Sequence, residues 1–126
     1  MAPWRSPEDL VALEHELQVD RQETAARVGE LAGQFDGIVE SAALEAPDDE
    51  HDPEGSTIGF ERAQLAALID QARAHLEDVD GALVRLRSGS YGTCEECGDP
   101  ISHERLLARP ASRTCIRCAE RAGRRR

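Results

Sequence analysis

Hydrophobic residues recur at steps of three and four along the first third of the chain. One row repeats every seven residues and consists of Leu10, Leu17, Thr24, Leu31 and Ile38. A second row interleaves with it and consists of Val28, Phe35 and Ala42. Two interleaved rows with this spacing form the a/d pattern of a coiled-coil helix. The pattern therefore predicts one long amphipathic helix in this stretch.

A second stretch of the chain shows the same period. Its apolar positions are Ile58, Leu65, Ile69, Ala72, Leu76, Val79, Leu83 and Leu86. From Leu65 onward the steps alternate between four and three residues, which gives the 3.5-residue period of a coiled coil. We expect a second long helix here.

The ends of both helices carry sequence signals. Ser6 can cap the first helix, and Pro7 fits the first helical position. The second helix should begin near Ser56 or Thr57 and end at Gly89, because glycine is common directly after a helix. Polar residues with helix breakers separate the two helices, so they should pack antiparallel as an intrachain hairpin. Homodimerisation through the same heptads is the alternative.

The segment that joins the two predicted helices, residues 46–56, is rich in carboxylates. It contains two prolines and a glycine, which exclude a continuous helix, and its acids are Asp48, Asp49, Glu50, Asp52 and Glu54. Clustered carboxylates can bind Mg²⁺, pair with arginine or lysine, or act on a metal ion held by another protein. The alternative interpretation is an acidic loop that only keeps the protein soluble.

Four cysteines near the C-terminus form two Cys-x-x-Cys pairs. They are Cys94, Cys97, Cys115 and Cys118. This spacing is typical of a structural zinc site, in which four thiolates surround the ion and leave no open position. A pair of disulfides is the alternative, and the lack of a visible signal peptide argues against it. A redox Cys-x-x-Cys motif is disfavoured because no βαβ pattern surrounds it.

Charge is distributed unevenly along the chain. The formal net charge is -10, and residues 1–60 hold 15 acidic against 3 basic residues, whereas residues 94–126 hold 5 against 8. A chain this acidic is repelled by a phosphate backbone, which argues against general nucleic-acid binding. Without a membrane span or targeting segment, we expect a cytoplasmic protein. No catalytic motif is present, so we expect no enzyme.

The cysteine region resembles the DksA/TraR family of bacterial zinc-finger proteins. The resemblance lies in Tyr91-Gly92-Thr93-Cys94-Glu95-Glu96-Cys97-Gly98, Ile101, Arg105-Leu106-Leu107-Ala108-Arg109-Pro110 and Cys115-Ile116-Arg117-Cys118. It implies direct binding to RNA polymerase, with the coiled coil entering the secondary channel. Acidic residues at the tip would then act near the catalytic Mg²⁺ of the polymerase and alter the lifetime of promoter complexes.

The chain also departs from the family pattern. Asp52 aligns with the first of two tip aspartates, whereas the second aspartate position falls on Gly55. In a shifted register, Asp49 and Asp52 have the separation of that pair. Basic residues with which the family prototype binds the alarmone ppGpp are replaced here by Asp78 and Ala119, while Arg109 is retained. The resemblance therefore implies no ppGpp response of the prototype kind.

The sequence thus predicts an all-α protein. A long antiparallel hairpin should span residues 1–90 with its acidic tip at 46–56, followed by a four-cysteine zinc module over 91–120 and a basic tail over 121–126. We expect a monomeric transcription regulator that binds RNA polymerase and holds one structural Zn²⁺. One alternative is a zinc-clamped adaptor whose heptads pair with another protein's helix. Another is a zinc ribbon that binds DNA through its arginine-rich end.

Overall fold

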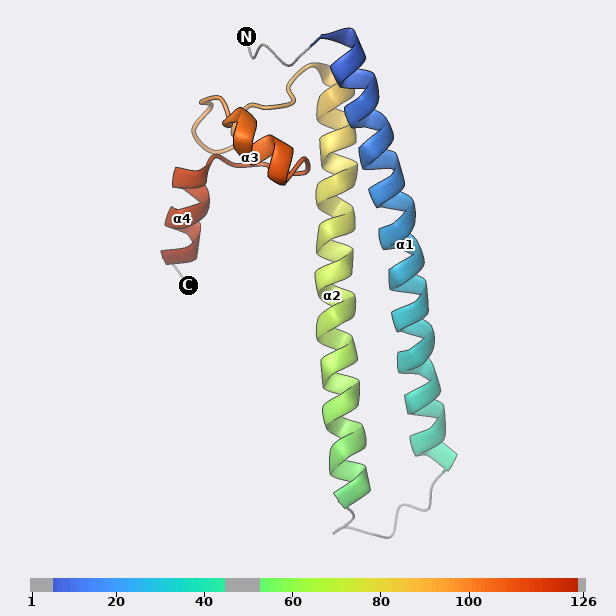
Figure 1. Cartoon of the computed structure of the whole chain (residues 1–126). Coiled ribbons are helices and arrows are strands. Elements are labelled where there is room, and N and C mark those ends of the chain that lie inside the picture. The colour runs from blue at the N-terminus through green and yellow to red at the C-terminus, as the bar shows by residue number, and fades with distance from the viewer. Residues whose placement is uncertain (1–5, 45–52, 125–126) are drawn as a thin grey trace. The chain divides into compact units, whose positions relative to one another are not determined.

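The structure is a computed structural model, in which residues 6–44 and 53–124 are described. Within these ranges the chain forms helices and no strand (Figure 1). The helices are α1 (Pro7–Leu44), α2 (Pro53–Ser88), α3 (His103–Ala108) and α4 (Ile116–Arg124). The prediction of an all-α fold is confirmed. None of these helices has the length and hydrophobicity that a membrane span requires.

The first long helix begins as predicted, and the second begins earlier. At the start of α1, Ser6 N–H donates to Asp9 Oδ2 at 3.3 Å, and Asp9 N–H donates to Ser6 Oγ at 3.1 Å. This reciprocal pair is a capping box. The predicted start of α2 near Ser56 or Thr57 is wrong by about one turn, since the helix begins at Pro53. Proline suits a first helical position because its missing N–H has no partner to lose there.

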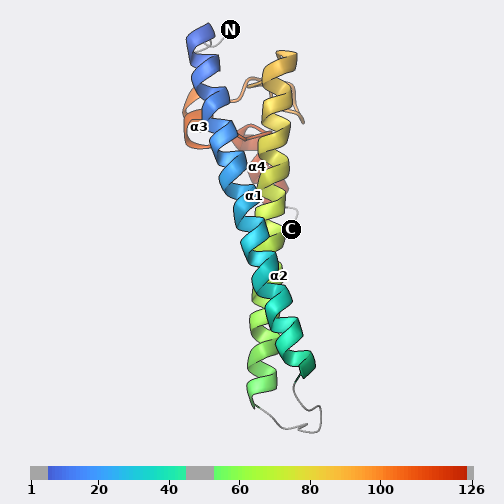
Figure 2. The ribbon, with the colours of Figure 1, turned by 90° about the vertical axis from the view of Figure 1, so that its right-hand side faces the viewer.

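The chain divides into two compact units, each of which contains part of α1 and part of α2. One unit runs from Glu23 to His75, and we call it the hairpin unit. The other contains the residues up to Gln22 and those from Leu76 onward, and we call it the finger unit. In each unit the stretch of α1 lies beside the stretch of α2 and runs in the opposite direction (Figure 2).

The hairpin unit is held by the predicted heptad seam. Leu31 on α1 is buried against Ile69 and Ala72 on α2. Partly buried apolar side chains extend this core: Val28, Phe35, Leu65 and Leu68. All of them except Leu68 belong to the rows that the sequence pattern singled out, so the a/d interpretation is confirmed here. The side chain of Ala42 lies outside the described part of the structure.

The finger unit has a larger and more varied core. Leu17 on α1 and Val79, Ala82 and Leu83 on α2 pack with residues of the C-terminal third. These further core residues are Tyr91, Cys94, Ile101, Leu106, Cys115 and Cys118. Val79 and Ala82 are fully buried. On the surface of the same unit, Arg21 of α1 forms an ion pair with Asp80 of α2. The cysteine region is therefore packed directly onto the end of α2.

Candidate metal centre

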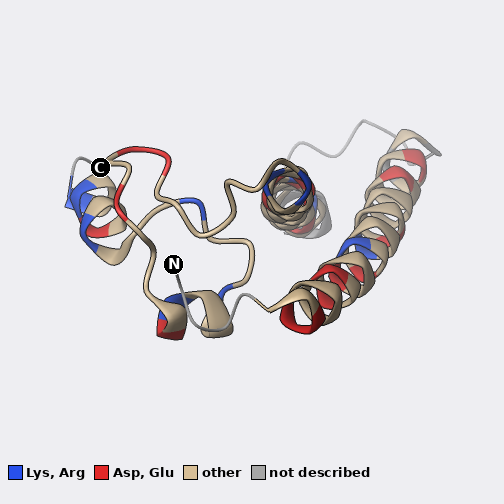
Figure 3. Ribbon diagram, turned by 90° about the horizontal axis from the view of Figure 1, so that it is seen from above, with Lys and Arg blue, Asp and Glu red and all other residues tan. Residues whose placement is uncertain are grey.

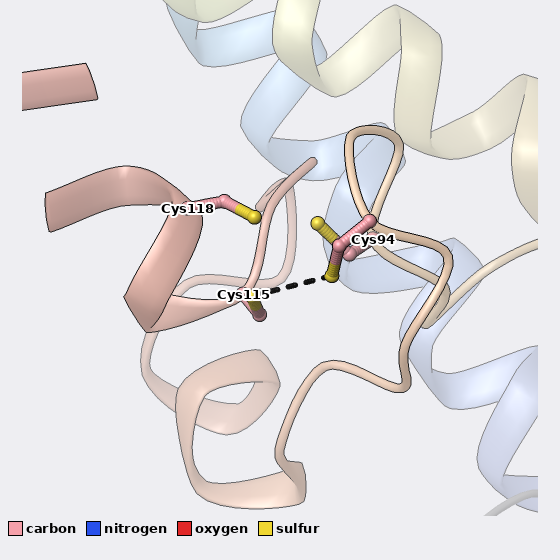
Figure 4. A group of neighbouring side chains, drawn as sticks. Cys94, Cys115 and Cys118 are labelled. Atoms are coloured by element: carbon pink, nitrogen blue, oxygen red, sulfur yellow. Dashed lines mark hydrogen bonds between the residues drawn. The ribbon is translucent and has the colours of Figure 1, made fainter. Parts of the chain in front are cut away.

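The four cysteines come together within the finger unit. Cys94 and Cys97 lie in the turns after α2, Cys115 directly precedes α4, and Cys118 lies in its first turn. All four Sγ atoms lie within 4.8 Å of one another. Figure 4 shows the sulfur atoms of Cys94, Cys115 and Cys118 turned toward a shared space. The structure thus brings together every predicted metal ligand.

The sulfur geometry fits a zinc ion. Four sulfurs at about 2.3 Å from a tetrahedral centre are separated from one another by about 3.8 Å. The Sγ atoms of Cys97 and Cys115 are 3.8 Å apart, and none of the four cysteines forms a disulfide. The four residues therefore hold one structural zinc ion. When bound, the ion supplies crosslinking between the two turns and no catalysis, because four thiolates leave no open coordination position.

The two Cys-x-x-Cys turns favour the thiolate at their first cysteine. The backbone N–H of Cys97 lowers the pKa of the Cys94 thiol to about 6. The N–H of Cys118 likewise lowers the pKa of the Cys115 thiol. The neighbouring sulfurs, Cys115 first, raise the pKa of Cys118 to about 12. Four thiolates this close repel one another, so the site is suited to a divalent cation that compensates their charge.

Backbone hydrogen bonds shape the first of these turns. Cys94 N–H donates to the carbonyl of Asp99 at 2.8 Å, and Thr93 and Pro100 form an antiparallel bridge. Gly98, directly after the second cysteine, has a φ of 79°, which favours glycine because it lacks a Cβ. The sequence Cys-x-x-Cys-Gly therefore encodes a turn that returns the chain past its own sulfurs.

A buried arginine joins the zinc module to α2. Arg85 is 8% exposed, and its Nη1 lies 3.3 Å from Oε1 of Glu95. In the sequence, Glu95 lies between the first two cysteines. The Nη2 of Arg85 donates to the carbonyl of Ser112 at 3.4 Å. Burial lowers the pKa of the Arg85 guanidinium, and the charge of Glu95 opposes that shift. One guanidinium thus connects both halves of the zinc module to the same helix.

A second arginine extends from the zinc module to α2. Arg113, just before the third cysteine, donates from Nη2 to the carbonyl of Glu77 on α2 at 3.1 Å. Its Nε makes no hydrogen bond of good geometry but lies 2.8 Å from Asp78 Oδ1, so we regard that contact as an ion pair. Gly81 makes room for both arginines, because a Cβ there would lie 3.1 Å from Arg85 Nη1 and 3.3 Å from Arg113 Nη2.

Sequence reasoning missed both arginines: a charged residue on a coiled-coil helix, such as Arg85, is normally solvated, and nothing near Arg113 in the sequence indicates its contact with α2. A signal was nevertheless present in α2. Near its end the small residues Gly81 and Ala82 adjoin the heptad positions Val79 and Leu83, which makes the apolar face wider than a two-helix seam needs. A wider face indicates that a third element packs there, and in the structure this element is the zinc module.

The charged segments that the sequence singled out are only partly described. Asp48, Asp49, Glu50 and Asp52 lie outside the described residues, and Glu54 belongs to α2 with a side chain that is not described. The basic tail begins within α4, where Arg121 and Arg124 are exposed, and residues 125–126 lie outside the description. Figure 3 shows these basic positions on the helix at the C-terminus. The Nη2 atom of Arg117 in α4 lies 3.3 Å from Asp99 Oδ2.

Comparisons with known proteins agree with this site. The prokaryotic DksA/TraR C4-type zinc finger matches residues 89–122. The RNA polymerase-binding transcription factor DksA of Caulobacter vibrioides is 42% identical over 65 residues, which are 52% of this chain and 46% of that protein. General stress protein 16O of Bacillus subtilis is 28% identical over 107 residues, or 85% of this chain and 60% of that protein. The chain thus spans about half the length of these relatives.

The fold has a solved counterpart. The transcription factor DksA2 from Pseudomonas aeruginosa superposes with a TM-score of 0.73 at 28% identity, covering 95% of this chain and 87% of that one. The fold and the site together define an all-helical protein with a structural C4 zinc site. Residues 89–122 match the DksA/TraR C4-type zinc finger, and over 95% of the chain the fold is similar to that of DksA2.

Proposed function

We propose that the chain is a DksA-like transcription regulator that binds RNA polymerase directly and inserts the acidic turn at residues 46–56 into its secondary channel. The observation that carries the proposal is the similarity to the transcription factor DksA2 over 95% of this chain. The zinc finger and the polymerase-binding relative from Caulobacter support the same role. The role is regulatory rather than enzymatic and belongs to the compartment that contains RNA polymerase.

The proposed mechanism assigns different tasks to different residues. Zinc, Arg85 and Arg113 fix the module to the last turns of α2 within the finger unit. The turn then contributes charge, through Asp48, Asp49, Glu50, Asp52 and Glu54. Carboxylates near the polymerase's Mg²⁺ alter the local field on which the stability of promoter complexes depends.

Site-specific crosslinking tests the contact directly. A photo-crosslinking amino acid at Asp52 should crosslink to the polymerase subunits that line the secondary channel. The matched control carries the same group at Glu30, an exposed position of α1 within the hairpin unit, and should give a different crosslinking pattern. Identical patterns from both positions, or crosslinks from neither, would contradict insertion of the turn.

A second experiment separates binding from action. Replacing the five acids of the turn with Asn and Gln preserves side-chain size and removes the charge. The variant should still bind purified core polymerase in a pull-down and should no longer change the lifetime of promoter complexes. If the wild-type chain fails to bind polymerase and sediments as a dimer or hetero-complex instead, the adaptor alternative is favoured.

A further inference from the structure

An apolar groove lies within the finger unit, away from the cysteines. It has a volume of about 340 Å³ and is formed between the first turns of α1 and the short helix α3. Its apolar floor includes Leu13 and the buried Leu106. Leu107 lines it as well and is 68% exposed. Such a volume is at the small end of ligand pockets, about 300–1,000 Å³, so the groove fits a few side chains.

The rim of the groove on α1 is acidic. Asp9 and Glu16 both line it, and their spacing of seven residues places them on one face of the helix, about 10 Å apart along its axis. Asp9 Oδ2 accepts the N–H of Ser6, and within residues 6–44 and 53–124 the arginines of the four ion pairs contact neither carboxylate. His103 also lines the groove. The carboxylates are therefore available to a cation from outside.

We propose that this groove binds a short segment of another protein that presents one apolar side chain flanked by arginine or lysine. The apolar anchor would displace water from Leu13, Leu106 and Leu107, and the flanking cations would pair with Asp9 and Glu16. Leu107 continues the apolar surface of the groove to the outside, and contiguous apolar surface with a polar rim is typical of interaction sites. Charge complementarity selects a basic partner, because among the described residues the acidic ones that line the groove are Asp9 and Glu16 and no arginine lines it.

This inference goes beyond the proposed function and does not depend on it. It involves neither residues 46–56 nor the binding of RNA polymerase. A basic, leucine-bearing segment could belong to any protein that meets the finger unit. The test therefore uses short peptides and no polymerase, so that loss of polymerase binding and failure of the groove give different results.

A library of random short peptides displayed on phage is panned against the full, zinc-loaded chain. We expect enrichment of peptides with a single large apolar residue flanked by Arg or Lys. Leu107→Ser should weaken the selected peptides by about tenfold or more, as removal of an anchor contact does. The matched control is Val84→Ser, because Val84 is 60% exposed in the same unit and does not line the groove. This control should bind the peptides like the wild type.

The charge requirement has its own variant. The double substitution Asp9→Asn and Glu16→Gln keeps the side-chain shapes, and Asn retains an oxygen for the cap of α1. It should weaken binding and remove most of its salt dependence. The proposal is overturned if no such peptides are enriched, or if the selected peptides bind the Leu107→Ser chain as tightly as the wild type. A concentration-dependent dimer that Leu107→Ser abolishes would instead assign the groove to a second copy.

Discussion

The two units of this chain are held together in different ways. The hairpin unit depends on one apolar seam, in which Leu31 packs against Ile69 and Ala72. The finger unit adds a metal centre, buried arginine contacts to main-chain oxygens and the four ion pairs described above. Hydrophobic burial is non-directional, whereas metal ligation and hydrogen bonds require set geometry. The contacts of the finger unit therefore fix the positions of its segments, whereas the apolar seam of the hairpin unit mainly keeps its two helical stretches close together.

Of all the changes, zinc removal should give the largest difference in stability between the two units. Structural zinc contributes apparent binding energies of about 10–16 kcal/mol in small finger peptides, so its loss should unfold the zinc module. Hydrogen-exchange mass spectrometry after chelation, or on Cys118→Ser, should show faster exchange at the amides of Cys94 and Ile101. Segments around Leu31 and Ile69 should keep their protection. Equal loss in both units would contradict the division.

Truncation of a core leucine should cost more in the finger unit than in the hairpin unit. Leu17 is 1% exposed and Leu31 is 6% exposed. We expect Leu17→Ala to lower the free energy of unfolding by about 4 kcal/mol and Leu31→Ala by about 3 kcal/mol, because a two-helix seam can relax around a cavity. Urea denaturation measures both. Val11→Ala, at a position 68% exposed, is the control and should change the free energy of unfolding by at most about 0.5 kcal/mol.

Loss of the buried guanidinium should have a smaller effect. Arg85→Ala leaves Glu95 and the Ser112 carbonyl without their partner and should cost about 2 kcal/mol of unfolding free energy. Arg85→Lys should recover little of this, because a single ammonium lacks the planar fork that reaches both acceptors. The exposed Arg87→Ala serves as control in the same denaturation series. Full recovery by lysine would show that only the charge matters.

The smallest effect is expected at the surface pair Arg21–Asp80. Both side chains are nearly half exposed, at 46% and 45%. A double-mutant cycle with Arg21→Ala and Asp80→Ala should give a coupling of about 0.5 kcal/mol or less, which salt should reduce further. A coupling as large as the effect of Arg85→Ala would mean that surface charge, too, fixes the helices in the finger unit.

Much of this architecture can be predicted from the sequence. The heptad rows predicted many of the buried side chains of both long helices, since Leu17, Leu31, Ile69 and Val79 all fall on them, whereas the buried Ala82 and Arg85 do not. The cysteine spacing predicted the ligand set, because two Cys-x-x-Cys pairs are the ligand pattern of a structural zinc site. Both signals are local repeats of residue type, so no knowledge of the tertiary fold was needed.

The remaining contacts depend on where distant segments meet. Arg85 and Arg113 are two of the chain's 15 arginines, and nothing in their immediate neighbours indicates that they connect the zinc module to α2. Their partners, the carbonyls of Ser112 and Glu77, are backbone atoms that every residue has. The groove beside Leu107 was equally hidden, because it forms only when the first turns of α1 meet α3. The start of α2 at Pro53 was missed because proline both breaks helices and begins them.

The glycine near the end of α2 has a consequence for how the chain can change length. Gly81 is the position of α2 against which the guanidinium groups of Arg85 and Arg113 lie. Matched insertions of whole heptads into both helices between Glu23 and His75 would keep this site and the contacts around it unchanged. An insertion between Gly81 and Arg85 would separate them. The hairpin unit can thus change its length by whole heptads, while the contacts around Gly81 tolerate no insertion.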